Sequence, residues 1–194
     1  PGNDGNGSYS GHVRIYQNVS GTWTQVGSDI DGEANDESGY SVSLSADGSI
    51  VAIGSPYNDL DSRGHVRIYQ NVNGTWTQLG SDIDGEADSD YSAWSVSLSD
   101  NGSVIAIGAP YNNGVNGSNT GHVRIYQNVN NTWTQVGSDI DGEASSDDSG
   151  YSVSLSADGS VVAIGAKYNS GENGSYSGHV RIYQNVSGTW KKIG

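Results

Sequence analysis

An internal repeat constrains the fold of this chain more than any other feature of its sequence. The heptapeptide Gly-His-Val-Arg-Ile-Tyr-Gln occurs four times, beginning at Gly11, Gly64, Gly121 and Gly178, with spacings of 53, 57 and 57 residues. A second block, Ser-Val-Ser-Leu-Ser leading to Ala-Ile-Gly, occurs three times. Variation in length falls between the blocks, where a folded chain tolerates insertions. The sequence therefore predicts a repeat architecture of two packed units joined by adjustable loops.

The second block predicts a β-hairpin. In its first copy Val42 and Leu44 alternate with serines, a period typical of a strand with one apolar face. Asp47-Gly48 follows, a pair that favours the positive φ angles of a tight type I′ turn. The returning segment 50–54 is apolar on both faces, so we expect it to be buried on both sides. The equivalent turn pairs are Asn101-Gly102 and Asp158-Gly159.

The heptapeptide block predicts a second hairpin. Residues 12–17 form its first strand, Ser20-Gly21 its turn and residues 22–26 its second strand. Later copies turn at Asn73-Gly74, Asn130-Asn131 and Ser187-Gly188. Because the chain nowhere shows the 3.6-residue period of an amphipathic helix, the sequence predicts an all-β protein.

Four strands per repeat match the size of one β-propeller blade of four antiparallel strands. A β-solenoid is the competing architecture, but its repeats are shorter and lack paired hairpins. We therefore expect a single repeat array with three complete blades and an N-terminal half-blade. The array covers 1–194, with the half-blade at 11–27 and blades at 39–80, 93–137 and 150–194.

Composition excludes several function classes. The net charge of −14 repels nucleic acid and anionic lipid, which both need a positive protein surface. No apolar run approaches the roughly 20 residues that cross a bilayer, so we expect no membrane insertion. Cysteine is absent, which excludes disulfides, thiolate metal sites and a cysteine nucleophile.

Each repeat contains three separated blocks in a fixed order, which in the last repeat are residues 149–153, 163–165 and 178–183. A Gly-Ala-Pro element is intact at 108–110 and altered to Gly-Ser-Pro at 54–56 and Gly-Ala-Lys at 165–167. In these blocks the repeat resembles the FG-GAP repeat of integrin α-subunit propellers. This resemblance implies a propeller of blades with a role in adhesion.

The sequence departs from that family at two places. Ser38, Ser92 and Ser149 replace the family's phenylalanine, and Ala93 once replaces the following glycine. The calcium loop that many members carry between the first two strands needs several aspartates, whereas residues 46–49 supply one. The resemblance therefore does not carry over the familiar calcium site.

Three acidic segments between the expected blades are the strongest candidates for a site. Each opens with Asp-x-Asp-Gly-Glu, a turn with convergent oxygens of the kind that Ca²⁺ prefers. The candidate ligands are Asp29, Asp31, Glu33, Asp82, Asp84, Glu86, Asp139, Asp141 and Glu143. The bidentate glutamate of an EF-hand loop is missing, so a Ca²⁺ site here would be weak. The alternative is a solvated loop whose carboxylates cap turns and pair with the repeated arginine.

Histidine and arginine recur once per repeat. They are His12, His65, His122 and His179, and Arg14, Arg67, Arg124 and Arg181. Equivalent positions in successive blades lie far apart, so we expect packed, hydrogen-bonded imidazoles rather than a shared zinc ion. The arginines are expected to form ion pairs across the interface between blades.

Near-identical repeats offer little asymmetry for a catalytic site, and no serine lies in a Gly-x-Ser-x-Gly elbow. The main exceptions to the repetition are Arg63, Trp94, Lys167 and Lys191-Lys192. We therefore expect no enzyme activity and no cofactor other than a weakly bound Ca²⁺.

These features predict a non-catalytic, extracellular or cell-surface structural and adhesive module. Because propellers need at least about four blades to close, we expect a homo-oligomer, a filament or part of a longer array. The alternative function is a repeat lectin that binds glycans through its recurring tryptophans and tyrosines. Glycans and other surface proteins are therefore the expected partners.

Overall fold

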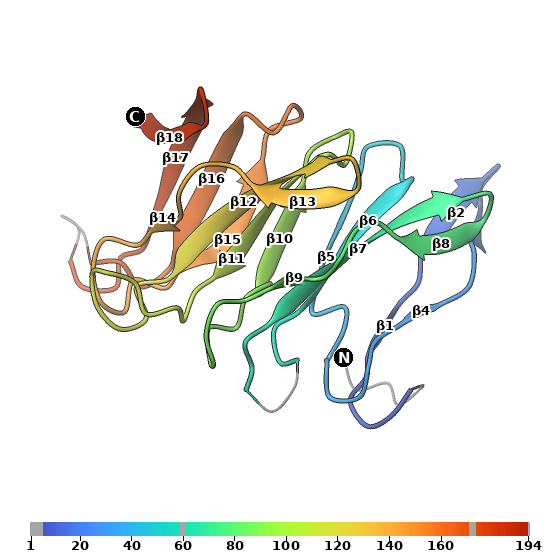
Figure 1. Ribbon diagram of the computed structural model, residues 1–194, viewed down its shortest axis with the longest axis horizontal. Coiled ribbons are helices and arrows are strands. Elements are labelled where there is room, and N and C mark those ends of the chain that lie inside the picture. Colours follow the sequence, from blue (N-terminus) through green and yellow to red (C-terminus); the bar gives the residue numbers. More distant parts are fainter. Residues whose placement is uncertain (1–5, 59–60, 171–173, 194) are drawn as a thin grey trace.

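The computed structural model describes residues 6–58, 61–170 and 174–193, so Pro1 and Gly194, the ends of the expected array, lie outside the described residues. Every helix or strand in these three ranges is a β-strand, which confirms the all-β prediction. Within them no helix is long and apolar enough to cross a membrane. The sheets follow one another in chain order along the longest axis of the molecule (Figure 1).

Three sheets of the same build make up most of the molecule. In each, consecutive strands pair antiparallel as a meander. The first sheet contains β5 (Ser41–Leu44), β6 (Ile50–Ser55), β7 (His65–Val72) and β8 (Thr75–Gln78). The second contains β10 (Ser95–Leu98), β11 (Val104–Ala109), β12 (His122–Val129) and β13 (Thr132–Gln135). The third contains β15 (Ser149–Leu155), β16 (Val161–Ala166), β17 (His179–Val186) and β18 (Thr189–Ile193).

Short strands attach the start of each acidic segment to a sheet. β9 (Ile83–Asp84) pairs with β7, and β14 (Ile140–Asp141) pairs with β12. The described part of the N-terminal segment contains only the strands equivalent to β7, β8 and β9. Its strands are β1 (His12–Val13), β2 (Tyr16–Val19), β3 (Thr22–Gln25) and β4 (Ile30–Asp31), with β1 paired to β4 and β2 to β3.

The hydrophobic cores lie between successive sheets. In β11, Ile105 and Ile107 pack toward the first sheet, whereas Ala106 packs with residues of the third. All three are buried, so the strand is covered on both faces, as its apolar sequence predicts. Fully burying an isoleucine contributes about 1.5–3 kcal/mol, and this pattern recurs at each junction between sheets.

The two kinds of hairpin turn differently. Ser20 and Gly21 have φ of 53° and 89°, and both are positive as a type I′ turn requires. The type I′ prediction is wrong for the other hairpin, where Gly48 has φ of 71° but Asp47 is not among the residues with positive φ. The Asp47 carboxylate accepts a hydrogen bond from the Ser49 amide at 2.9 Å, which holds a longer loop of residues 46–49.

Candidate functional site

Arg67 lies between carboxylates of two repeats. Its Nε donates to Asp82 of its own repeat at 2.9 Å. Its terminal nitrogens lie 3.0 Å from Glu33 and 3.5 Å from Asp36, both in the preceding acidic segment. Asp36 is buried, so water cannot solvate its carboxylate. The Arg67 guanidinium stabilises the negative charge in place of water.

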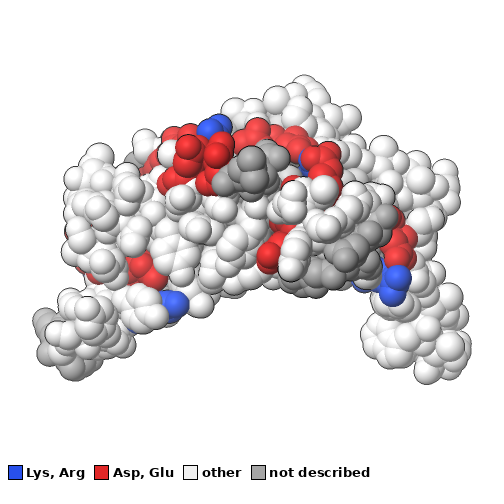
Figure 2. All heavy atoms as spheres, turned by 90° about the horizontal axis from the view of Figure 1, so that it is seen from below, with Lys and Arg blue, Asp and Glu red and all other residues white. Residues whose placement is uncertain are grey.

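The other arginines repeat this arrangement. Two kinds of pair recur among the described residues. In one, the first aspartate of an acidic segment pairs with the arginine of its own repeat; in the other, the glutamate of the segment pairs with the arginine of the next repeat. These pairs are Arg14–Asp29, Arg124–Asp139, Arg124–Glu86 and Arg181–Glu143. The expected ion pairs across the interface are thereby confirmed for Arg67, Arg124 and Arg181. On the face shown in Figure 2, the carboxylates lie in several groups with a few basic side chains beside them.

The later aspartates of each segment cap turns. Asp36 accepts a hydrogen bond from the Glu33 amide at 3.1 Å, and Asp90 accepts one from the Ala87 amide at the same distance. The side-chain amide of Asn112 donates a hydrogen bond to the carboxylate of Asp90 at 2.9 Å, in the buried interior. Burial raises the pKa of Asp36, although the hydrogen bond from the Glu33 amide and the charge of Arg67 favour the ionised carboxylate.

His65 and His122 are buried, as expected for packed imidazoles. The His65 Nε2 lies 3.6 Å from Asp36 and has no hydrogen-bond partner among the described residues, so the expected hydrogen bond is not formed at this nitrogen. The Nδ1 of His122 lies 3.8 Å from Asp139. Burial lowers the pKa of both histidines, although the facing aspartates act in the opposite direction. Both imidazoles are therefore neutral at pH 7.

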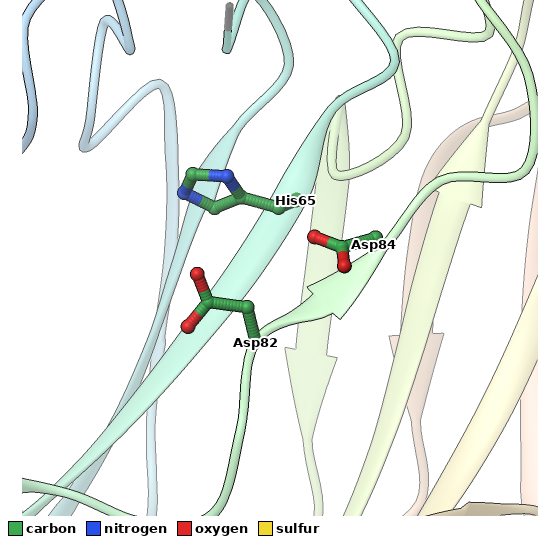
Figure 3. A group of neighbouring side chains, drawn as sticks. All are labelled: His65, Asp82 and Asp84. Carbon is green, nitrogen blue, oxygen red and sulfur yellow. The ribbon is translucent and has the colours of Figure 1, made fainter.

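The predicted cation ligands are regrouped by the fold. Within the described ranges, two sets of three side chains bring ligand atoms within 4.8 Å of one another. They are His65, Asp82 and Asp84, shown in Figure 3, and Glu86, His122 and Asp139. Glu86 thus joins the histidine of the following repeat instead of the aspartates of its own segment.

The remaining predicted ligands lie elsewhere. Asp29 and Glu33 pair with different arginines, Arg14 and Arg67. Asp31 and Asp141 lie opposite His12 and His122 in the strand register. Glu143 pairs with Arg181. Because guanidinium groups already neutralise most of these carboxylates, the arrangement disfavours tight binding of a divalent cation.

Sequence reasoning missed a cluster of aromatic side chains, although it noted that Trp94 breaks the repetition. Trp94 contacts five tyrosine rings at centroid distances of 4.8–6.5 Å: Tyr40, Tyr57, Tyr91, Tyr111 and Tyr151. We call these six residues the Trp94 cluster. The rings come from all three sheets, so a signal inside one repeat could not reveal it. The recurrence of a tyrosine shortly after each Gly-Ala-Pro-like element was the available sequence signal.

Four rings of the Trp94 cluster line a surface pocket of about 380 Å³, together with Ser89 and Asn119; these rings are Tyr57, Tyr91, Trp94 and Tyr111. Burial raises the pKa of Tyr40 to about 12. Burial also raises the pKa values of Tyr57 and Tyr111. The phenols are therefore uncharged at physiological pH, and the pocket offers neutral aromatic faces and hydroxyl groups.

A second kind of pocket recurs between repeats. Each copy places the Asp-x-Asp pair of one repeat beside the tryptophan of the next. The copies measure about 330, 240 and 270 Å³ and are lined in part by Asp29 and Trp76, by Asp82 and Trp133, and by Asp139 and Trp190. An aromatic ring next to carboxylates is a combination that can hold a polar ring or a cation.

Solved structures show the fold class. The chain is similar to a candidate 6-phosphogluconolactonase from Bacteroides uniformis ATCC 8492, with a TM-score of 0.64 and 12% identity over 95% of this chain and 48% of that one. It is also similar to a candidate 6-phosphogluconolactonase from Bacteroides fragilis NCTC 9343, with a TM-score of 0.51 and 14% identity over 78% of this chain and 36% of that one. The chain thus spans about half the length of the first neighbour and about a third of the length of the second.

At these identities the likeness concerns the fold alone. No curated protein sequence matches the chain. The family model of the FG-GAP repeat matches residues 23–69, which extend from β3 through β4, β5 and β6 into β7. That match confirms the resemblance seen in the sequence motifs. Residues 23–69 therefore carry an FG-GAP repeat, within an all-β chain of β-propeller type.

Proposed function

We propose that this chain is a non-catalytic structural and adhesive module of an extracellular or cell-surface protein, and that further copies of the same repeat cover its two end sheets. The observation that carries the proposal is that each end exposes the face that inner sheets bury. FG-GAP repeats typically occur in extracellular or surface proteins, which supports the location.

The C-terminal end exposes apolar residues that are covered elsewhere. In β17, Val180 and Ile182 are 66% and 42% exposed, whereas their equivalents in β12, Val123 and Ile125, are 0% and 1% exposed. Both strands have the same sequence, so the difference in exposure arises because the third sheet packs on β12 and no further sheet in the described part of the chain packs on β17. An exposed face of this kind favours association with a matching sheet.

The N-terminal end offers the complementary surface. The indoles of Trp76, Trp133 and Trp190 each donate to a backbone carbonyl of the preceding repeat. Trp23 holds the equivalent place in the N-terminal segment and is 66% exposed. The equivalent carbonyl at the other end belongs to Ile193. A head-to-tail contact would therefore place Trp23 of one copy on Ile193 of the next, repeating the internal junction.

Repetition supports the absence of catalysis. The polar groups of each junction recur in the next one, with the same arginine, aspartate and glutamate in each. A catalytic constellation needs distinct partners for a nucleophile, a base and a stabilising group. The two lactonase-like neighbours supply a direct check. We expect no hydrolysis of 6-phosphogluconolactone by the purified chain above the spontaneous rate.

A pair of surface variants tests the association. Ile182→Glu places a charge on the exposed face of β17 and should shift the chain toward the monomer in sedimentation velocity. Val115→Ser is the matched control, because Val115 is an exposed apolar residue in a loop away from both end sheets. Equal sedimentation of wild type and Ile182→Glu at every concentration would refute an interface on this face.

A repeat lectin is the second candidate function. The observation that favours it is the recurring pocket, where Asp29 and Trp76, or their equivalents, share one surface. Carboxylates that accept hydrogen bonds from sugar hydroxyls beside an aromatic ring would suit a glycan. Binding on a glycan array that is lost in Trp133→Ala would support it, and an absence of binding to any saccharide at millimolar concentration would exclude it.

A further inference from the structure

A lysine side chain lies against two tyrosine rings in the third sheet. The Nζ of Lys167 lies 3.6 Å from the ring centroid of Tyr151 and 4.4 Å from that of Tyr168. Both distances are well within the range of a cation–π contact. This pair of rings, with Tyr151 in β15 and Tyr168 just after β16, therefore accommodates an ammonium group.

The second sheet has the same pair of rings without the lysine. Trp94 stands where the third sheet has Tyr151, and Tyr111 stands where it has Tyr168. Their rings lie 5.4 Å apart at 88°. Pro110 replaces Lys167, so the chain supplies no ammonium group from this position.

The second sheet also adds aromatic walls to this position. Tyr91 stands where the other repeats have Glu37 and Asp148. Its ring lies 5.3 Å from Tyr111 at an angle of 75°, and 5.4 Å from Tyr57 of the first sheet at 76°. Such steep angles are typical of edge-to-face contacts between aromatic rings. Together with Trp94, these tyrosines line the pocket of about 380 Å³.

We propose that the pocket of the Trp94 cluster binds an organic cation, a primary or quaternary alkylammonium group, in the position that Lys167 occupies in the third sheet. Tryptophan is the strongest aromatic partner for a cation, and the second sheet is where it replaces tyrosine. The net charge of −14 draws cations to the surface. The Glu37 carboxylate, whose charge acts on Tyr57, works in the same direction, whereas Asp148 faces the Lys167 ammonium.

Titration with tetramethylammonium chloride, followed by tryptophan fluorescence and calorimetry, tests the proposal. We expect saturable binding with a Kd on the order of 1–10 mM, as for a few cation–π contacts on an open surface. Sodium chloride controls for ionic strength. The neutral alcohol 3,3-dimethylbutan-1-ol controls for shape against choline, and it should not bind.

Variants assign the binding to the Trp94 cluster. Trp94→Ala should weaken it at least tenfold, because it removes the best cation–π partner. Trp94→Tyr, which copies the residue of the other two repeats, should retain the fold and weaken binding less. Pro110→Lys should block the pocket with an internal ammonium group, and Lys167→Ala should free the Tyr151 pair and add a second, weaker site. Trp23→Ala, which removes a distant exposed tryptophan, should leave binding unchanged.

Different probes distinguish the sources of the cation. Choline and phosphatidylcholine vesicles represent a headgroup, and the amides of N-acetyl-lysine and N-acetyl-trimethyllysine represent a peptide. Binding of any of these that is lost in Trp94→Ala supports the proposal. Equal binding of the neutral alcohol, unchanged binding by Trp94→Ala, or no saturable response to any cation would overturn it. Binding of a saccharide at Trp94 in place of the cations would also overturn it and would assign the pocket to a glycan.

Discussion

The indole Nε1 of Trp76 donates a hydrogen bond to the backbone carbonyl of Val26, 2.8 Å away in the preceding repeat. The same bond joins Trp133 to Leu79 and Trp190 to Val136, each also at 2.8 Å. A glycine follows each acceptor residue. A Cβ on Gly27 would come within 2.8 Å of the Trp76 ring, so only glycine allows this approach. The tryptophan and the glycine therefore form one joint between repeats.

Trp133→Ala should destabilise the chain by about 2 kcal/mol, because a large partly buried ring and its hydrogen bond are both lost. Trp133→Phe keeps most of the ring and should cost about 1 kcal/mol. Urea unfolding followed by circular dichroism measures both. Trp23→Phe is the matched control for Trp133→Phe, because Trp23 is exposed, and it should change the monomer's stability little. Equal losses for Trp133→Phe and Trp23→Phe would contradict the role assigned to the joint.

Arg67→Met should be more destabilising than Arg14→Met. The first substitution leaves the buried Asp36 and the half-buried Asp82 without their guanidinium, a loss of about 2 kcal/mol or more. Arg14 faces Asp29 in a solvent-exposed pair, and such pairs contribute little. Thermal unfolding of the two variants compares them directly, and a larger effect from Arg14→Met would refute the account of the arginines.

Much of this structure could be read from the sequence, because strands and turns depend on local patterns. The alternation at Val42 and Leu44 and the pair Ser20-Gly21 predicted hairpins where they occur. The turn at Asp47 could not be read in the same way, since its side chain competes for the backbone amide of Ser49.

The candidate sites were harder to predict, because they depend on contacts between repeats. An acidic segment looks convergent along the chain, yet the fold sends Glu33 to Arg67 and Asp29 to Arg14. The rings of Tyr57 and Tyr151 reach Trp94 only because neighbouring sheets stack. Residue spacing within one repeat contains neither relation.

Stability should fall as the pH drops below about 6.5, the pKa of an unperturbed imidazole. Burial lowers the pKa of His122 in the folded chain, so below that pH the unfolded chain binds a proton that the folded chain does not. Proton uptake by the unfolded state shifts the equilibrium toward unfolding. His122→Gln should therefore reduce the decrease in Tm between pH 7 and pH 5. A wild-type Tm that is constant or rises over this interval would contradict the burial of a neutral imidazole.

Calcium should raise the Tm only slightly. Arginines already pair with many of the carboxylates that could bind it, including Asp82 and Asp139. Tight binding to the folded state would stabilise it in proportion to the logarithm of ligand concentration over Kd. Unfolding in millimolar CaCl₂ should therefore match unfolding in chelator to within about 2 °C. An increase of many degrees would show that His65, Asp82 and Asp84, or their equivalents, form a true cation site.

The mass of the purified chain in solution tests the central proposal most directly. Multi-angle light scattering across a range of micromolar concentrations reports whether the exposed faces at Trp23 and Val180 find partners. We predict a mass above the 20.2 kDa of one chain, as a closed oligomer of fixed size or as assemblies that grow with concentration. A stable monomer of 20.2 kDa at every concentration would contradict the proposal that further copies of the repeat cover the two ends.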